Sequence, residues 1–257
     1  MENKIVHHTN IKMIPLDIVR GIKDTWNHTK GDADYSVTEL LQPPKVRALK
    51  ILHKEEISED YSDSIAAFIG TAVHQTIENA NKIHDDCKTE ERMEVSLKID
   101  GKSFLISGTV DHYSITDNIL SDYKTTNAYA VNYDKPDWTH QLNIYRWMYS
   151  KLYKDNPIPD ARIIAILKDW SKGRATNSNT YPPSPVMIKP IENWSQDEIQ
   201  DFIVERIKLH EEAIKEPQKF ICSDEEIWLS PKGIATRCEQ WCNVNSFCQQ
   251  YKEREND

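Results

Sequence analysis

The sequence predicts an α/β fold in which a mixed central sheet is flanked by helices. Strand-type residues fill 92–114 on both sides of Asp100-Gly101, a dipeptide typical of two-residue hairpins. A third strand-like stretch follows at 119–125, and a helical pattern over 137–153 then leads to an apolar strand at 161–169. This order of strands and helices indicates mixed α/β structure.

The remaining elements follow from their local patterns. Apolar residues at helical spacing predict amphipathic helices, and a Pro-Pro pair interrupts one of them because proline lacks the amide hydrogen that a helix interior needs. The expected helices are 15–29, 36–53 with a break at Pro43-Pro44, 63–84 with an apolar stripe from Ile65 to Ala80 facing the core, and 195–215. A loop is expected at 170–185 and a short strand at 186–190.

Length and composition indicate an ordinary globular protein. The 257 residues are 39% hydrophobic and 28% charged, which fits a single domain with an N-terminal helical part (1–60), a core (61–190) and a C-terminal helix with a cysteine-bearing tail (191–257). No apolar stretch is long enough to span a membrane, and the N-terminus has no signal-peptide pattern, so we expect a cytoplasmic protein. The net charge of −9 argues against a nonspecific nucleic-acid coat protein.

Two carboxylates and one ammonium stand in the stretch "GTVDHYSITDNILSDYKTTN". Asp122 and Lys124 lie two apart in a strand and therefore share one face. Asp111 comes from the neighbouring strand and joins them if the turn at 115–118 pairs the two strands. Converging carboxylates repel unless a cation such as Mg²⁺ lies between them, and a lysine beside that cation can orient a water for attack on a phosphodiester. The alternative is an ordinary surface ion pair.

Polar residues on two of the expected helices extend this set. His74 lies on one stripe with Gly70 and Glu78, where an ordinary hydrogen-bonded surface histidine is the alternative. Gln141 and Tyr145 fall on the apolar stripe of the 137–153 helix, and a buried amide and hydroxyl must find partners. A phosphate or a metal-bound water would serve both. A hydrogen bond between the two side chains is the alternative.

Read in order, "GTAVH", "GTVD", "SDYKT" and "QLNIY" resemble the RecB-like branch of the PD-(D/E)XK nuclease superfamily over about residues 36–150. The resemblance implies Mg²⁺- or Mn²⁺-dependent phosphodiester hydrolysis. Under it, Asp111, Asp122 and His74 are metal ligands, Lys124 activates the water, and Gln141 and Tyr145 hold the DNA or the lysine's surroundings. The DNA contacts that we expect, in part from this resemblance and in part from the basic segment that starts at Lys45, are Ser36, Thr38, Lys45, Arg47, Gly70 and Thr125.

The tail "RCEQWCNVNSFCQQY" is similar to the three-cysteine segment of iron–sulfur members of this branch. It holds Cys238, Cys242 and Cys248, but Gln42 stands where those members have their fourth cysteine. A [4Fe–4S] cluster normally takes four thiolates, and Cys222 or Cys87 is a candidate substitute. Zinc binding and three unligated cysteines in a reducing compartment stay open as alternatives.

The function expected from the sequence is a metal-dependent DNA exonuclease of recombination, repair or phage replication. Its partner would be single-stranded DNA or duplex DNA with an end, and its setting the cytoplasm of a bacterium or of a phage-infected host. A non-cleaving nucleic-acid-binding module of the same fold and a structure-dependent endonuclease are the alternatives. A metal hydrolase of another class, or an interaction protein, is a further rival, for which Gln141 and Tyr145 would be core residues only.

Overall fold

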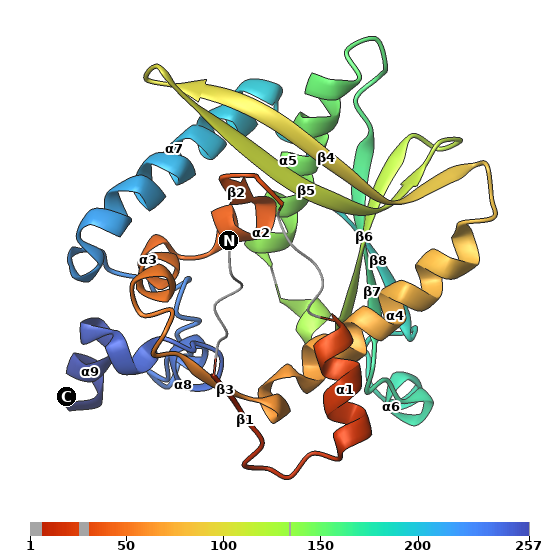
Figure 1. Ribbon diagram of the computed structural model, residues 1–257. Coiled ribbons are helices and arrows are strands. Elements are labelled where there is room, and N and C mark those ends of the chain that lie inside the picture. Colours follow the sequence, from red (N-terminus) through yellow and green to blue (C-terminus); the bar gives the residue numbers. More distant parts are fainter. Residues whose placement is uncertain (1–6, 26–30, 134, 257) are drawn as a thin grey trace. The chain divides into compact units, whose positions relative to one another are not determined.

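The computed structural model describes residues 7–25, 31–133 and 135–256 (Figure 1). Contacts divide this part of the chain into two compact units, each with its own packing. The sheet unit holds the described residues of 25–38 and 66–201, and the helical unit holds those of 7–24, 39–65 and 202–256. The expectation that residues 1–257 form one nuclease domain stays a prediction.

The sheet unit is built on a mixed sheet that six strands form. The strands are β2 (Tyr35–Ser36), β4 (Cys87–Ile99), β5 (Lys102–Ser114), β6 (Ile119–Thr126), β7 (Asp160–Leu167) and β8 (Val186–Pro190). Their order is β2-β5-β6-β7-β8, and β4 pairs with β5. The β4–β5, β5–β6 and β7–β8 pairs are antiparallel, whereas β2–β5 and β6–β7 are parallel. The predicted α/β class with a mixed central sheet is therefore confirmed.

The turn between β4 and β5 is the predicted two-residue hairpin. Asp100 and Gly101 have φ angles of 50° and 87°, the left-handed conformation that such turns require at both central positions. Aspartate and glycine are among the residues that tolerate it best. The hairpin lets both strands run for 13 residues each, so β5 reaches far enough to carry Gly108 and Asp111 to the middle of the sheet.

Three helices and one 3-10 turn complete the sheet unit. They are α4 (Ile65–Asn81), η3 (Ala128–Asn132), α5 (Pro136–Leu152) and α6 (Lys172–Asn177). Helix α5 is the crossover between the parallel strands β6 and β7, and it packs against the sheet with its buried residues between Leu142 and Tyr149 (Figure 1).

Two local expectations for this unit are wrong. The stripe of α4 does not enter the core: no side chain of α4 is fully buried and Ile69 is 41% exposed. The side chains of this helix are therefore half-buried or exposed. The expected loop at 170–185 contains the short helix α6, in which Thr176 and Asn177 donate side-chain hydrogen bonds to backbone oxygens one turn earlier.

The helical unit consists of short segments around two small apolar clusters. Its elements are β1 (His7–Thr9), α1 (Leu16–Asp24), α3 (Pro44–Leu52), β3 (Ser58–Asp60), η2 (Tyr61–Ser64), η4 (Pro217–Lys219), α8 (Thr236–Gln240), η5 (Asn245–Phe247) and α9 (Gln249–Asn256). Helices α2 (Val37–Leu41) and α7 (Gln196–Lys215) begin in the sheet unit and continue in the helical unit.

The helix boundaries follow the expected signals. Helix α3 begins at Pro44, where a proline at the first position costs no hydrogen bond, so the predicted break is confirmed. Helix α1 buries Val19 and Ile22, while the rest of the predicted 15–29 helix beyond residue 25 lies outside the described residues. Within the described ranges, no helix has the length and apolar character needed to cross a membrane.

Candidate active site and cysteine pocket

The β5–β6 hairpin brings the three polar residues of the predicted site together. The turn at 115–118 pairs the strands antiparallel, so Asp111 lies beside β6. The backbone N–H of Tyr123 donates to Asp111 Oδ2 at 2.7 Å and fixes that carboxylate. Asp122 and Lys124 project from one face of β6, with Lys124 Nζ 2.7 Å from Asp122 Oδ2. The convergence that strand alternation predicts is therefore present.

Helix α5 holds the lysine in place. Lys124 Nζ donates to Gln141 Oε1 at 3.0 Å, and Gln141 Nε2 donates to the Tyr145 hydroxyl at 3.2 Å. These two bonds fix which end of the amide faces the lysine. The hydrogen bond between Gln141 and Tyr145, which was the alternative to a functional role, is present. The same Gln141 amide also accepts a hydrogen bond from Lys124. Burial, and then the Asp122 carboxylate, raise the pKa of the Tyr145 hydroxyl, which therefore stays protonated.

One oxygen of Asp122 is short of hydrogen bonds. Asp122 is only 2% exposed, and its Oδ2 accepts no well-aligned hydrogen bond from any described residue, although Lys124 Nζ is close. A buried carboxylate oxygen in this state is costly unless something else binds it. Hard divalent cations bind carboxylate oxygens, so the donor set of Asp111 and Asp122 fits Mg²⁺ or Mn²⁺.

The pKa of Asp111 is raised by its burial and by the neighbouring Asp122 carboxylate. Burial, and then the charge of Asp122, raise the pKa of Asp111 to about 8, against the opposing effects of the Tyr123 amide and Lys124. A cation between the two groups would remove this repulsion and allow both to ionise.

His74 on α4 faces the same carboxylate. Its Nε2 lies 2.8 Å from the carbonyl oxygen of Tyr123, and its Nδ1 lies 3.6 Å from Asp111 Oδ2. Burial lowers the pKa of His74, which favours the neutral ring that binds metals. Glu78, one turn along the helix, is instead paired with Lys82 at 2.6 Å.

Glu90 is a site residue that sequence reasoning missed. Ligand atoms of Glu90, His74 and Asp111 all lie within 4.8 Å of one another, a grouping that can hold a metal ion. Glu90 lies among several charged residues at the start of β4, Lys88, Glu91 and Arg92, so no periodic pattern distinguishes it. Only the pairing of β4 with β5 identifies it.

Gly108 permits the close packing of Tyr145. A Cβ atom at this position would lie 2.6 Å from the Tyr145 ring and 2.8 Å from Val37 Cγ2, closer than side chains tolerate. We expect Gly108→Ala to destabilise the fold by about 1–3 kcal/mol through overpacking, and to displace Tyr145 from Gln141. Chemical denaturation measures the first effect, and Gly70→Ala is the matched control because its Cβ meets open space within a helix. Equal stability of the two variants would contradict the packing role of Gly108.

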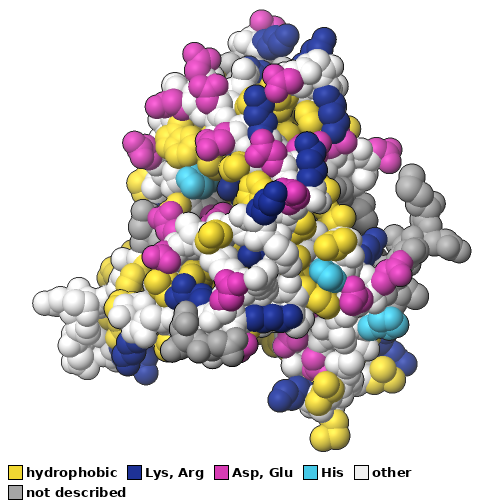
Figure 2. Space-filling model, turned by 90° about the vertical axis from the view of Figure 1, so that its left-hand side faces the viewer, with side chains coloured by type: hydrophobic (Ala, Val, Ile, Leu, Met, Phe, Trp, Pro, Cys, Tyr) yellow, Lys and Arg dark blue, Asp and Glu magenta, His cyan; other side chains and the backbone are white. Residues whose placement is uncertain are grey.

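Four of the expected DNA contacts lie in the sheet unit. Ser36 Oγ and Thr38 Oγ1 are 3.0 Å apart where β2 passes into α2. Gly70 faces open space on α4, and Thr125 follows Lys124 on β6. On the face drawn in Figure 2, lysine and arginine side chains are interspersed with aspartate and glutamate side chains.

The other two expected DNA contacts are buried. Lys45 and Arg47 on α3 are 2% and 9% exposed. The structure therefore does not place them on a basic surface strip, because α3 packs most of its circumference within the helical unit. Lys45 lies instead at a pocket that is described next.

The cysteine pocket lies in the helical unit. The four cysteines of the C-terminal segments, Cys222, Cys238, Cys242 and Cys248, all line it, together with Lys45 and Arg254. None of them is in a disulfide. Cys222 is held by Gln250, which accepts from its backbone N–H at 2.9 Å and donates to its carbonyl oxygen at 2.8 Å.

Of the two candidate substitute cysteines, Cys222 lines the pocket and Cys87 does not. Cys87 lies in β4 of the sheet unit, where its sulfur donates to the Asn81 carbonyl, and it is not at the pocket. Gln42 does not line the pocket either. Burial raises the pKa of Cys222 to about 12 and also raises the pKa values of Cys238 and Cys242, so these three thiols are protonated when no metal is bound.

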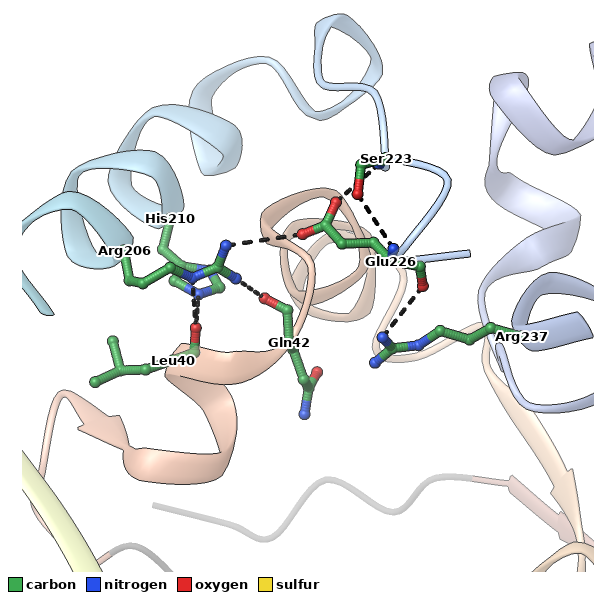
Figure 3. A network of polar contacts seen from close by, with 7 residues as sticks. All are labelled: Leu40, Gln42, Arg206, His210, Ser223, Glu226 and Arg237. Carbon is green, nitrogen blue, oxygen red and sulfur yellow. Dashed lines mark hydrogen bonds and ion pairs between the residues drawn. The ribbon is translucent and has the colours of Figure 1, made fainter. Parts of the chain in front are cut away.

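A polar network holds the chain next to Cys222 (Figure 3). From α7, Arg206 donates to the carbonyl oxygens of Leu40, at 2.8 Å, and of Gln42. Arg206 also lies 3.7 Å from Glu226, whose carboxylate accepts from the Ser223 N–H at 3.0 Å. The network ties α7 to the end of α2 and to the segment that follows Cys222.

His210 makes this network sensitive to acid. It is fully buried, and its Nε2 donates to Leu40 O at 3.1 Å. Burial, and then the charges of Arg206 and Arg47, lower the pKa of His210 to about 4 despite that hydrogen bond. A lowered histidine pKa contributes stability that is complete above pH 6.5 and is lost as the pH falls toward 4, here about 3 kcal/mol.

We therefore expect the free energy of unfolding to fall between pH 6.5 and pH 4, and His210→Gln to flatten that fall. Glutamine keeps an N–H donor for Leu40 and does not titrate. Urea denaturation across this range measures the slope, and identical slopes in parent and variant would remove His210 as the cause.

No family model matches the chain, and no curated protein matches it. Among solved structures, the chain is similar to the crystal structure of SSO0001, with a TM-score of 0.56 and 16% identity over 90% of this chain and 93% of that chain. The two proteins share a fold. A crystal structure of a phage-related exonuclease from Haemophilus somnus 129PT has a TM-score of 0.35 and 15% identity over 58% of this chain and 70% of that chain, which is too distant to carry an argument.

Proposed function

We propose that this protein is a Mg²⁺- or Mn²⁺-dependent deoxyribonuclease of the RecB-like branch of the PD-(D/E)XK superfamily, acting at DNA ends in recombination, repair or phage replication. One observation carries the proposal. The buried Asp122 carboxylate lies 2.7 Å from Lys124 and beside Asp111 on the neighbouring strand. Two converging carboxylates that share a single lysine are an arrangement that a divalent cation stabilises.

Each residue of the site has a distinct task in phosphodiester hydrolysis. Asp111 and Asp122 would hold the cation, which supplies charge stabilisation and a water of lowered pKa. Lys124 donates to Gln141 and lies close to Asp122, which leaves it an N–H for the attacking water or for a phosphate oxygen. Gln141 and Tyr145 keep the ammonium aimed at that point.

A preference for DNA ends follows from the charge of the protein. A chain with net charge −9 has little long-range attraction for duplex DNA, whose nonspecific binding depends on neutralised phosphates. Binding would then rely on local contacts, for which Ser36, Thr38, Gly70 and Thr125 are the candidates. A free strand can thread into such a site more easily than an intact duplex.

The test of this function uses labelled linear single- and double-stranded DNA, incubated with Mg²⁺, Mn²⁺ or a chelator. We expect metal-dependent shortening from the ends and no change in a supercoiled plasmid. Nicking of the closed circle at enzyme concentrations that barely shorten linear DNA would identify an endonuclease instead. DNA binding without cleavage would identify a binding module of the same fold, and the absence of both would favour the non-nuclease rivals.

We also propose that Cys222, Cys238, Cys242 and Cys248 hold a [4Fe–4S] cluster, which would clip the C-terminal segments together. The four cysteines line one pocket, and four thiolates are the usual ligand set of such a cluster. Lys45, buried at the same pocket, would balance the negative charge of the ligated thiolates.

A further inference from the structure

Two exposed tyrosines lie just beyond the end of β6. Tyr129 belongs to η3 and Tyr133 directly follows that turn, and their side chains are among the exposed ones, at 48% and 68%. Tyr129 follows Lys124 by five residues, so the Cα atoms of these two residues are at most about 18 Å apart. The tyrosine pair is therefore within reach of a short nucleic-acid strand that occupies the candidate active site.

Buried contacts hold the Tyr129 ring in place. This ring meets the ring of Tyr181 edge to face, with centroids 5.2 Å apart, and Tyr181 itself is buried. The Tyr181 hydroxyl donates to the carbonyl oxygen of Asp169 at 3.2 Å and accepts from the Ser171 N–H at 3.0 Å. The loop after β7 thus supports the exposed ring, which has little conformational freedom left to lose when a ligand stacks on it.

The turn that carries the tyrosines is also anchored at both ends. The Ala128 N–H donates to Asp169 Oδ1 at 2.6 Å, and Lys189 Nζ of β8 donates to the carbonyl oxygen of Val131 at 2.7 Å. Ala128 and Val131 are buried. Exposed connecting segments are ordinarily mobile, so these anchors favour a role that depends on how the exposed side chains of η3 are oriented.

Three cations lie beside this turn, in the loop after β7. The side chains of Lys168, Lys172 and Arg174 are exposed, and none is paired with an acidic residue of the described chain. Asp169, the acidic residue among positions 168–174, is already hydrogen-bonded to η3. The Lys168 N–H donates to the carbonyl oxygen of Thr126 at 3.0 Å, so the loop starts directly beside the segment that leads into η3. In a protein of net charge −9, this local positive charge favours a polyanionic ligand.

We propose that the two tyrosines form a stacking platform for the bases of single-stranded DNA, and that the three cations bind its phosphates. The proposal rests on the proposed function and specifies the surface that would hold the unpaired strand next to the site. Stacking on an aromatic ring tolerates any sequence because every base has a π face, and cations along the backbone add affinity. Duplex DNA keeps its bases paired and cannot offer them to the rings, so the single strand is the form that fits.

The experiment measures binding of a fluorescent single-stranded oligonucleotide to the full chain by anisotropy, with chelator present so that no strand is cut. We expect Tyr129→Ala to weaken binding about tenfold, because stacking on one ring contributes on this scale. Tyr129→Phe should bind like the parent because it keeps the ring. Tyr129→Leu should bind as weakly as Tyr129→Ala, because leucine offers apolar area without a ring face.

An abasic strand of the same length separates stacking from charge. It carries the same phosphates and no bases, so it should bind the parent and Tyr129→Ala equally. Equal binding also shows that the variant is folded.

The salt dependence of binding tests the cations. Lys172→Gln should reduce the slope of log affinity against log salt concentration by about 0.7, the value for one phosphate contact to a single strand. Lys98→Gln is the matched control, because Lys98 is an exposed lysine of the same unit beside the β4–β5 turn, and it should leave the slope unchanged.

Unchanged affinity in Tyr129→Ala, or an equal loss with the abasic strand, would overturn the stacking platform. Full affinity in Tyr129→Leu would do so as well and would identify an apolar contact surface for a protein. An unchanged salt slope in Lys172→Gln would overturn the phosphate contact. Cleavage of DNA with unchanged affinity in Tyr129→Ala would reject the platform and leave the proposed function standing, whereas ring-dependent binding without metal-dependent cleavage would do the reverse.

Discussion

Replacement of Asp122 by asparagine is expected to lower metal-dependent cleavage of linear DNA by at least about a hundredfold, because it removes a ligand of the cation proposed at Asp111 and Asp122. Asparagine has nearly the same shape, so the buried position creates no cavity. Lys124→Ala is expected to abolish cleavage as well, through loss of the ammonium. Initial rates on labelled linear DNA provide the measurement.

The control for this change is Asp117→Asn, which removes the same charge from the turn at 115–118. Asp117 accepts from Ser114 Oγ at 3.0 Å, and an asparagine oxygen can do the same. Its rate should stay within about twofold of the parent. Turnover of Asp122→Asn within about threefold of the parent would remove Asp122 from the chemistry.

The same substitution should not cost stability when metal is absent. The raised pKa of Asp111 means that the folded protein binds more protons than the unfolded chain, so stability is lost as the pH rises from about 4 toward 8. Removal of the Asp122 charge weakens the cause of that shift. With chelator at pH 8, Asp122→Asn should therefore be as stable as the parent or more stable, which urea denaturation can check.

Replacement of Cys222 by serine is expected to remove most of the cofactor from the cysteine pocket. Anaerobically purified parent protein should be brown, with broad absorption at about 400 nm from thiolate-to-iron charge transfer. Cys222 contributes one of the four sulfurs at the pocket, and its backbone is clamped by Gln250, so its loss opens the cluster on one side. Absorption and iron content per chain give the readout, independent of any cleavage.

Cys87→Ser is the matched control, because Cys87 lies in β4 and does not line the pocket. It should retain colour and iron. Colourless parent protein with zinc in place of iron would reassign the metal, and the lack of both metals would leave only unligated cysteines. Full iron content in Cys222→Ser would exclude Cys222 as a ligand.

The arrangement of the strands that carry the candidate site could be predicted because it depends on short-range rules. The period of two along a strand places Asp122 and Lys124 on one face, and the spacing of four along a helix places Gln141 beside Tyr145. Each relation depends only on the geometry of a single strand or a single helix, and not on how the rest of the sheet is arranged. Asp111 needed only the short turn that pairs its strand with the next.

The missed features depend on tertiary contacts. Glu90 is a ligand candidate only because β4 pairs with β5 and because its own backbone leaves the extended region. Lys45 and Arg47 were expected at the surface from their charge. Long basic side chains usually keep their charged ends in water. Lys45 and Arg47 depart from that rule, and only the packing of distant segments shows what they meet.

The short connection between β5 and β6 also bears on how the chain folds. Because the turn at 115–118 closes a small loop, Asp111 and Asp122 can meet on the microsecond timescale of hairpin formation. The parallel pairing of β6 with β7 must wait until α5 has crossed the sheet, and only then can Lys124 reach Gln141. Two carboxylates are therefore brought together early, before the lysine is fixed, and a divalent cation that bridges them would favour formation of the hairpin and of the native sheet.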